Sequence, residues 1–253
     1  TPLYSSAASD VYKRQTVGYD IYSPQGKLLE FNMQEVTIPG RSTDTVRFTP
    51  FIYGTNANKW EPGAKNPPLY KVMLFTRRDG AYREYMPLKI GFGKTELVDG
   101  RLTRFDKELK LVKAGYNAAA DRKTTLAELK TLKAKGNNTI CPDYPQPGWF
   151  YDLCDELGLY VIDCANINAP EKRDDRKVGG TPSNDPSLAD EYLERVKAMY
   201  YRSRNHSCVI AFALGGESGN GYNMYKAYEW LKSVEKSRPV ICADADGEWN
   251  SDL

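Results

Sequence analysis

The sequence predicts a two-part fold in which short antiparallel strands precede alternating strands and helices. Up to about residue 102, short apolar and polar alternations are separated by turn signals such as Pro39-Gly40 and Asp79-Gly80. After Leu102 the period changes, and apolar runs of strand length alternate with helix-like patterns. The first part therefore predicts an all-β domain, and the second predicts a parallel sheet.

The composition is that of a globular protein. Of the 253 residues, 41% are apolar and 27% are charged, and the net charge is +2. This balance indicates no polyanionic partner, so we expect no nucleic acid. No apolar run reaches the roughly 18 residues that a membrane span needs, and the N-terminus has no signal-peptide pattern.

The five cysteines all lie in the second half of the chain and lack metal-ligand spacing. Most of them fall within or at the ends of predicted strands or helices, which is typical of buried free thiols. Cys141 and Cys164 end neighbouring predicted strands, so a disulfide between them is the alternative if the protein is exported.

The first fifteen residues do not share the strand pattern of the residues after them. Residues 5–15 (SSAASDVYKRQ) resemble translated sequencing-adapter sequence, a contaminant at the ends of metagenomic reading frames. We therefore exclude residues 1–15 from the predicted fold as a non-native tail. On this interpretation the native N-terminus is missing, and the absence of a signal peptide carries no information.

Residues 16–102 predict an antiparallel sandwich of immunoglobulin-like type. Val17–Tyr22 alternates, Ser23–Gly26 is a turn with proline at its second position, and a strand resumes at Lys27. Further short strands are expected at Glu35–Ile38, Thr45–Phe48, Tyr70–Thr76, Tyr82–Met86 and Lys89–Phe92.

Residues 103–253 predict parallel strands with helices between them. Thr125 and Glu128 form a capping box at the start of the first helix, which Gly136 ends. The other helices are expected to run from Pro147 to Leu157, from Asp185 to about Arg204 and from Asn223 to Lys236. The strands are expected at Leu109–Tyr116, Asn138–Cys141, Leu159–Asp163, Val209–Leu214 and Val240–Ala243.

Two folds fit this alternation. An open doubly wound sheet usually carries a glycine-rich phosphate loop after its first strand. Here the first turn between strand and helix is Asn117–Asp121, which has no such loop. We therefore interpret residues 103–253 as the N-terminal part of a (β/α)8 TIM barrel, truncated after its fifth strand.

A lone carboxylate follows one of these strands. The apolar run Val209–Leu214 stops at Gly215 and Gly216, and Glu217 comes next. Barrel enzymes place their chemistry in the loops at the carboxyl ends of the strands. A surface glutamate in such a loop is the alternative, and this stretch by itself supports both equally.

Several longer motifs resemble glycoside hydrolase family 2, the β-galactosidase and β-glucuronidase family. They are Trp149–Asp163 (WFYDLCDELGLYVID), Ala165–Ile167, Arg204–Ile210 (RNHSCVI) and Leu214–Gly219 (LGGESG). The resemblance covers residues 16–253. It implies an immunoglobulin-like domain followed by the front half of a catalytic barrel.

The resemblance implies a retaining glycosidase in which Glu217 is the general acid/base. Such an enzyme protonates the leaving oxygen with one carboxylic acid while a second carboxylate, about 5–5.5 Å away, attacks the anomeric carbon. By resemblance this nucleophile follows the seventh strand, which lies beyond Leu253. The chain alone is therefore not expected to complete the reaction.

This sequence departs from the family pattern at several site positions. Gly216 stands where an asparagine usually precedes the acid/base, and Cys141–Pro145 lacks an arginine and a histidine that follow the second strand. Asn168 and Pro170 replace a glutamate and a histidine that help hold magnesium in some members, so we expect no metal or other cofactor. Either the substrate is unusual or the parent protein has lost activity.

Other site candidates each have a second interpretation. Asp163 and Asn166 follow the third strand and either face the pocket or cap the loop, and Asp143 either contacts a sugar hydroxyl or caps a turn. Asp244 and Glu248 follow the fifth strand, as substrate contacts or solvated acids. Trp249 is a candidate for stacking on a sugar ring, and His206, before the fourth strand, is expected to be structural.

The resemblance implies a terminal β-linked glycoside as substrate, a full-length protein able to form oligomers, and a bacterial periplasmic or extracellular location. The alternative is a non-catalytic carbohydrate-binding or structural relative that has lost activity. The residue changes at Gly216, Cys141 and Asn168 motivate that alternative.

Overall fold

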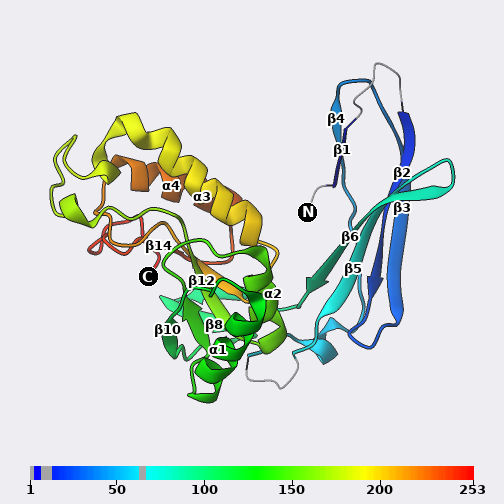
Figure 1. Ribbon diagram of the computed structural model, residues 1–253, viewed down its shortest axis with the longest axis horizontal. Helices are drawn as coiled ribbons and strands as arrows, with labels where there is room; N and C mark the ends of the chain where they lie inside the picture. The colour runs from blue at the N-terminus through cyan, green and yellow to red at the C-terminus, as the bar shows by residue number, and fades with distance from the viewer. Residues whose placement is uncertain (1–2, 7–12, 63–66) are drawn as a thin grey trace. The chain divides into compact units, whose positions relative to one another are not determined.

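The computed structural model describes residues 3–6, 13–62 and 67–253 and divides into two compact units (Figure 1). The first unit comprises the chain up to Trp60 together with Pro68–Phe92, and the second comprises Glu61–Pro67 and Gly93–Leu253. The predicted boundary at residues 102 and 103 falls inside strand β8 (Arg101–Arg104). The hairpin that contains β8 belongs to the second unit, so the division lies earlier than the sequence predicted.

The first unit is built on an antiparallel sheet of order β3-β2-β5-β6. Its strands are β2 (Lys13–Tyr22), β3 (Leu28–Ile38), β5 (Tyr70–Arg78) and β6 (Ala81–Ile90). Two pairs of predicted strands are thus single long strands, because β3 and β6 continue where the sequence pattern is interrupted. In β6 the interruption is Pro87, which an edge strand tolerates.

One face of this sheet carries the core of the sandwich. Tyr19, Ile21, Val72 and Leu74 are buried on it, and the partly buried residues that cover them are Phe48, Ile52, Leu88 and Ile90. A second, two-stranded antiparallel sheet pairs β1 (Leu3–Ser6) with β4 (Thr43–Val46). The antiparallel sandwich predicted for this region is confirmed.

The predicted tail takes part in this pairing where the structure describes it. Leu3–Ser6 forms β1, and residues 13–15 continue β2 opposite Val36–Ile38. Residues 1–2 and 7–12 lie outside the described residues. Strand pairing runs through the backbone and needs no particular side chains. The non-native origin of the tail therefore stays a prediction.

The second unit contains a parallel sheet of order β10-β11-β12-β13-β14. The strands are β10 (Lys113–Gly115), β11 (Thr139–Cys141), β12 (Tyr160–Cys164), β13 (Val209–Ala213) and β14 (Val240–Ile241). Each strand pairs with the next one along the chain, which is the winding of a barrel. A doubly wound sheet reverses its strand order at a switch point, so that alternative is wrong.

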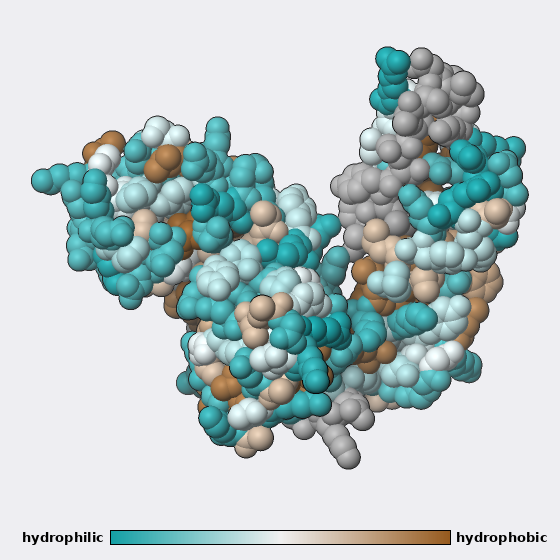
Figure 2. Space-filling model, in the orientation of Figure 1, coloured by the Kyte–Doolittle hydropathy of each residue, from teal (hydrophilic) through white to brown (hydrophobic). Residues whose placement is uncertain are grey.

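Four helices accompany this sheet: α1 (Arg122–Ala134), α2 (Gly148–Leu157), α3 (Ala189–Ser203) and α4 (Tyr222–Val234). α1 packs on α2 and α3 packs on α4 (Figure 1). On α3, Tyr192, Val196 and Met199 are buried at helical spacing. The opposite face carries acidic and basic residues, and the surface there is mostly hydrophilic in Figure 2.

The start of α1 differs from the prediction. The cap is Asp121, whose Oδ1 accepts a hydrogen bond from the backbone N–H of Thr124 at 2.9 Å. Thr125 lies inside the first turn and is fully buried. An aspartate accepts this bond as well as a threonine does, so the helix begins earlier than predicted, after Asp121.

A short antiparallel sheet precedes the barrel strands. It consists of β7 (Thr95–Val98), β8 (Arg101–Arg104) and β9 (Lys107–Glu108). Arg104 is 4% exposed and donates to Thr95 Oγ1 at 3.0 Å. Its guanidinium lies so close to Gly93 that a Cβ there would meet Arg104 Nη2 at 2.3 Å, which explains the glycine.

Short 3-10 turns complete the described elements: η1 (Thr55–Asn58), η2 (Pro170–Lys172), η3 (Pro182–Asn184) and η4 (Pro186–Leu188). In the described parts of the chain, no helix combines the length and the apolar character needed to cross a membrane.

Candidate active site

Glu217 lies directly beyond the carboxyl end of β13, as the sequence predicted, and 67% of its side chain is exposed. The two glycines before it are close to the loop that follows β12. Gly215 has no room for a side chain, because a Cβ would lie 2.8 Å from the Ile167 carbonyl oxygen. The backbone N–H of Gly216 donates to that same oxygen at 2.9 Å. The β12 loop thus supports the approach to Glu217.

The segment Ile167–Ser183, which we call the strap, packs around the backbone of Glu217 and Ser218. The backbone N–H of Ala169 donates to the Glu217 carbonyl at 3.0 Å. The hydroxyls of Thr181 and Ser183 donate to the Ser218 carbonyl at 2.7 and 2.8 Å. The strap therefore holds the backbone at the candidate acid/base.

The charged side chain of Arg173 contacts both Glu217 and Asp244. Nη1 of Arg173, in the strap, lies 3.3 Å from Glu217 Oε1, and Nη2 lies 2.8 Å from Asp244 Oδ1. The other oxygen of Asp244 accepts the backbone N–H groups of Ser218 and Gly219 at 2.8 and 2.7 Å. The Asp244 side chain is only 9% exposed, so it holds the loop and Arg173 and has little surface left for a substrate.

The sequence interpretation missed Arg173. The available signal was the charged block Glu171–Lys177 in a long loop after a barrel strand, where functional side chains are common. A single sequence gives no means of choosing one arginine of the block.

A second arginine of the strap forms ion pairs with two further acids of the β14 loop. Arg176 pairs with Asp246 at 2.7 Å and with Glu248 at 2.5 Å. The Tyr225 hydroxyl also donates to Glu248 at 2.5 Å. This hydrogen bond, with burial, raises the pKa of Tyr225. Glu248 is therefore engaged by protein groups on both of its oxygens.

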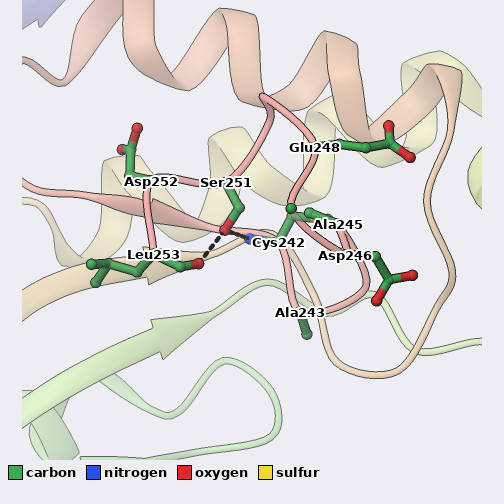
Figure 3. Close-up of a pocket in the computed structure, with 9 residues that line it drawn as sticks. Cys242, Ala243, Ala245, Asp246, Glu248, Ser251, Asp252 and Leu253 are labelled. Atoms are coloured by element: carbon green, nitrogen blue, oxygen red, sulfur yellow. Dashed lines mark hydrogen bonds between the residues drawn. The ribbon is translucent and has the colours of Figure 1, made fainter. Parts of the chain in front are cut away.

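A cavity of about 370 Å³ lies in the β14 loop near the C-terminus. Asp246, Glu248 and Asp252 are among its lining residues. Figure 3 shows the carboxylates of Asp246 and Glu248 on one side of the loop and that of Asp252 on the other. Glu217 is not among the lining residues, so this cavity is separate from the acid/base position.

Trp249 packs on helix α4. Its ring centroid lies 5.3 Å from that of Tyr225 and 5.6 Å from that of Tyr228, and the residue remains 55% exposed. The tyrosines hold the indole, while its exposed area is available to a planar apolar partner. This geometry is compatible with sugar stacking.

Asp163 is not placed to contact a substrate, contrary to one interpretation of the sequence. It is fully buried. Its carboxylate accepts from the Tyr151 and Ser203 hydroxyls, both at 2.6 Å, and lies 3.5 Å from Arg202 Nη2. These partners come from α2 and α3, so Asp163 ties the helices to β12. Burial raises the pKa of the Asp163 carboxyl above its usual value.

The remaining predicted contacts are spread over the same edge of the sheet. Asp143 is exposed, and its Oδ2 accepts from Asn117 Nδ2 at 2.8 Å. Asn166 is exposed, and its carbonyl accepts from Arg195 at 2.7 Å. A Cβ on Gly216 would meet its nearest neighbour, Asn168 Oδ1, at 3.5 Å, which is ordinary contact.

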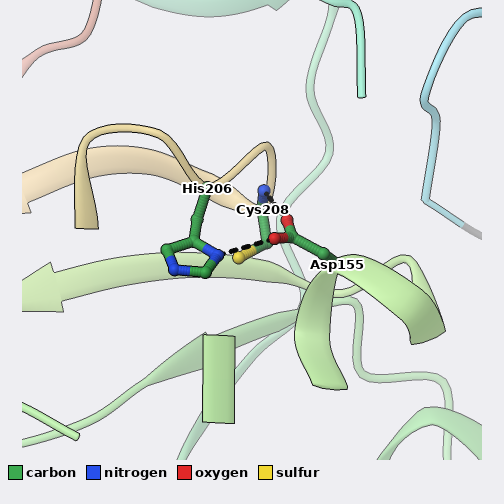
Figure 4. Close-up of side chains that lie close together, drawn as sticks. All are labelled: Asp155, His206 and Cys208. Carbon is green, nitrogen blue, oxygen red and sulfur yellow. Dashed lines mark hydrogen bonds and ion pairs between the residues drawn. The ribbon is translucent and has the colours of Figure 1, made fainter. Parts of the chain in front are cut away.

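His206 lies at the opposite, amino-terminal end of β13, where it was expected to be structural. The carboxylate of Asp155 contacts both His206 and Cys208 (Figure 4). Asp155 Oδ2 lies 2.7 Å from His206 Nδ1, and Oδ1 accepts from the Cys208 backbone N–H at 2.7 Å. These bonds link α2 to the start of β13.

The donor atoms of Asp155, His206 and Cys208 lie within 4.8 Å of one another, close enough to share a metal ion. Burial raises the pKa of the Cys208 thiol, and its S–H donates to the Tyr151 carbonyl oxygen at 3.6 Å. Both Asp155 oxygens already have partners. The cluster fits a hydrogen-bonded structural link better than a metal site. All five cysteines are free thiols.

One prediction concerns Gly219, where the strap crosses the loop after Glu217. Its φ is +70°, and a Cβ would lie 2.3 Å from the Arg173 carbonyl oxygen. We expect Gly219→Ala to lower the free energy of unfolding by about 1–3 kcal/mol for strained backbone, and further for the clash. Gly136→Ala is the matched control, because φ is +93° there in open space. Urea denaturation giving equal losses for both variants would contradict the packing argument.

The sequence of this chain is similar to a known protein family and to known proteins. The family described as "Glycosyl hydrolases family 2, TIM barrel domain" matches residues 115–252. The β-galactosidase of Vibrio cholerae is 34% identical over 185 residues, which are 69% of this chain and 18% of that protein. The β-galactosidase of Lactococcus lactis is 36% identical over 190 residues, with the same two coverages. The chain thus spans about 18% of the length of these curated relatives.

Solved structures share the fold. A Bacteroides uniformis β-glucuronidase covers 95% of this chain with a TM-score of 0.79 at 17% identity, and the match takes in 31% of that protein. A putative β-galactosidase from Bacteroides fragilis covers 95% with a TM-score of 0.78 at 17% identity, over 36% of its own length. At this identity the likeness concerns the fold only. The chain belongs to glycoside hydrolase family 2, as shown by the family match, by the sequence identity to the Vibrio cholerae β-galactosidase and by the parallel sheet with strands in chain order.

Proposed function

We propose that this chain carries the acid/base half of a retaining glycoside hydrolase that removes a terminal β-linked sugar, as a β-galactosidase does. The observation that supports this most directly is the exposed carboxylate of Glu217 at the carboxyl end of β13, with its backbone held by the strap. Barrel enzymes place catalytic groups at this end of their strands. Membership of family 2 implies that a glycoside is bound.

The proposed reaction has two steps. In the first, protonated Glu217 donates its proton to the glycosidic oxygen as the bond to the anomeric carbon breaks, and a second carboxylate bonds to that carbon. In the second, the Glu217 carboxylate takes a proton from water, whose oxygen displaces the enzyme carboxylate. The second carboxylate would come from a residue outside residues 1–253 of this sequence.

Sugar contacts are proposed for the exposed groups near this edge of the sheet. Trp249 offers an exposed ring for stacking, and Asp143 offers an acceptor for a hydroxyl. Asn166 is a further candidate, because its side chain is exposed after β12. Gly216 has no side chain, so residue 216 itself would not obstruct a substrate substituent beside Glu217.

The test is an assay of the full-length protein that contains this chain against β-galactoside, β-glucuronide and β-mannoside substrates. We expect turnover of at least one of them, with the β configuration retained in the first-formed product observed by proton NMR. Inversion of the anomeric centre would contradict the proposed mechanism. Tight binding of a glycoside without any turnover would favour the competing non-catalytic, carbohydrate-binding function.

A further inference from the structure

One guanidinium bridges the candidate acid/base and a buried anchor. Arg173 places Nη1 3.3 Å from Glu217 Oε1 and Nη2 2.8 Å from Asp244 Oδ1. We infer that Arg173, seated by Asp244, is a positioning residue that orients the Glu217 carboxyl for proton transfer. The inference rests on the proposed acid/base role of Glu217.

Asp244 makes the bridge rigid. Its Oδ1 receives Arg173, and its Oδ2 receives the backbone N–H groups of Ser218 and Gly219. One nearly buried carboxylate therefore holds both the guanidinium and the backbone next to Glu217. Charge-assisted bonds to an anchor of this kind fix direction as well as distance. The Asp244 side chain thus fixes the position of the guanidinium relative to the backbone that follows Glu217.

Glu217 needs an external constraint, because 67% of its side chain is exposed. Among the ion pairs of the described residues, Arg173 is the partner of its carboxylate. An exposed ion pair of this kind contributes only about 0–1 kcal/mol to stability. Removing the arginine should therefore change orientation at the carboxyl far more than it changes folding.

The contact also distinguishes the two oxygens of Glu217. A guanidinium donates hydrogen bonds and accepts none. The oxygen that faces it, Oε1, must therefore act as an acceptor, whether the carboxyl is protonated or not. The acid proton is left to Oε2, which is the oxygen directed to the leaving group in this proposal. The donor role of the guanidinium does not depend on whether Glu217 is protonated, so the constraint applies in both reaction steps.

The charge of Arg173 is shared between two carboxylates. Asp244 takes the shorter contact, 2.8 Å against 3.3 Å for Glu217. The guanidinium can therefore orient Glu217 while Asp244 neutralises part of its positive charge. This division suits a group that has to be protonated in one step and ionised in the next.

The experiment compares Arg173→Met with Lys172→Met in the full-length protein. Lys172 is a neighbouring, exposed cation of the strap, so both variants lose one positive charge. Two aryl glycosides of the same sugar are used, one with a leaving group that needs protonation and one, a dinitrophenolate, that does not. We expect Arg173→Met to reduce kcat for the first by about 10- to 100-fold, because small misplacements cost up to about 100-fold.

For the dinitrophenyl substrate, kcat/KM reports the glycosylation step and should be unaffected by Arg173→Met. Its kcat and KM should fall together, because the second step still needs an oriented Glu217 and the glycosyl-enzyme accumulates. Lys172→Met should have the same kcat and KM as the wild type for both substrates. Arg173→Lys should recover only part of the rate, since an ammonium cannot bridge two carboxylates as a planar fork does. Thermal unfolding of each variant checks that the fold is kept.

The outcomes separate this inference from the proposed function. If Glu217→Ala shows the leaving-group dependence of a lost acid and Arg173→Met does not, the positioning inference is wrong and the function stands. If Glu217→Ala shows no such dependence, the function itself fails. In the Glu217→Ala background, Arg173→Met should cause no further loss. An additional loss there would show that the arginine acts on something other than Glu217.

Discussion

Replacing Glu217 with alanine in the full-length protein should lower kcat/KM for a glycoside with a poor leaving group by about 100- to 10,000-fold, the usual contribution of a general acid. A substrate that releases dinitrophenolate should keep its fast first step, because this leaving group departs without a proton. The carboxyl is exposed at the carboxyl end of β13, so its removal should not disturb packing. Initial rates and the pre-steady-state burst measure the two steps.

Azide provides the second half of this test. The second step needs Glu217 to deprotonate water, so Glu217→Ala should accumulate the glycosyl-enzyme. Azide carries no proton to remove, so it should attack the anomeric carbon, release the enzyme carboxylate and form a β-glycosyl azide. Glu171→Ala is the control, because Glu171 is an exposed carboxylate of the strap. Failure of azide to speed turnover, or equal losses for both variants, would exclude Glu217 as the acid/base.

Replacing Asp163 with alanine should cost about 3–5 kcal/mol of unfolding free energy, the usual effect of breaking a buried charged network. Its carboxylate holds the Tyr151 and Ser203 hydroxyls at 2.6 Å and lies 3.5 Å from Arg202. The variant leaves these buried groups without their common acceptor. Urea denaturation of the chain, with Glu229→Ala as a surface control from the α4 pair Lys226–Glu229, measures the difference. A loss no larger than that of the control would contradict the structural role.

The contribution of Asp163 to the free energy of unfolding should depend on pH in a definite direction. Burial raises the folded-state pKa of this carboxyl above its unfolded value of about 3.9. Its stabilising contribution is therefore complete below the unfolded pKa and is lost as pH rises through the folded pKa. Asparagine does not titrate, so the stability gap between wild type and Asp163→Asn should narrow as pH rises above about 4. If the stability difference between the wild type and Asp163→Asn widened over the same range, the folded state would favour the charged form of Asp163, which contradicts the prediction.

The sequence-based prediction was correct where a local pattern marks the end of a strand or the buried face of a helix. Apolar runs ending in glycine located the β13 strand and placed Glu217 at its carboxyl end, and the structure agrees. Helix spacing located α3, whose buried face repeats at Tyr192, Val196 and Met199. Both signals depend on neighbouring residues only.

There is a physical reason why the sequence did not predict the contacts of Asp163. A barrel strand is buried on both faces, so its sequence is apolar throughout and contains no alternation. The run Leu159–Asp163 therefore shows where a strand lies and leaves open which face each residue takes. The packing of α2 and α3 decides that the Asp163 carboxylate is directed to the helices, where Tyr151 and Ser203 receive it.

The sequence by itself determined the fold class, the family and the place of Glu217, because each depends on short-range periodicity or contiguous motifs. Only the tertiary structure decided that Arg173 reaches Glu217 and Asp244, and that Arg176 occupies Asp246 and Glu248. Charged residues in a long loop have no local preference for one partner over another. Their pairing is set by the loops that the parallel strands bring to one edge of the sheet, across large separations in the sequence.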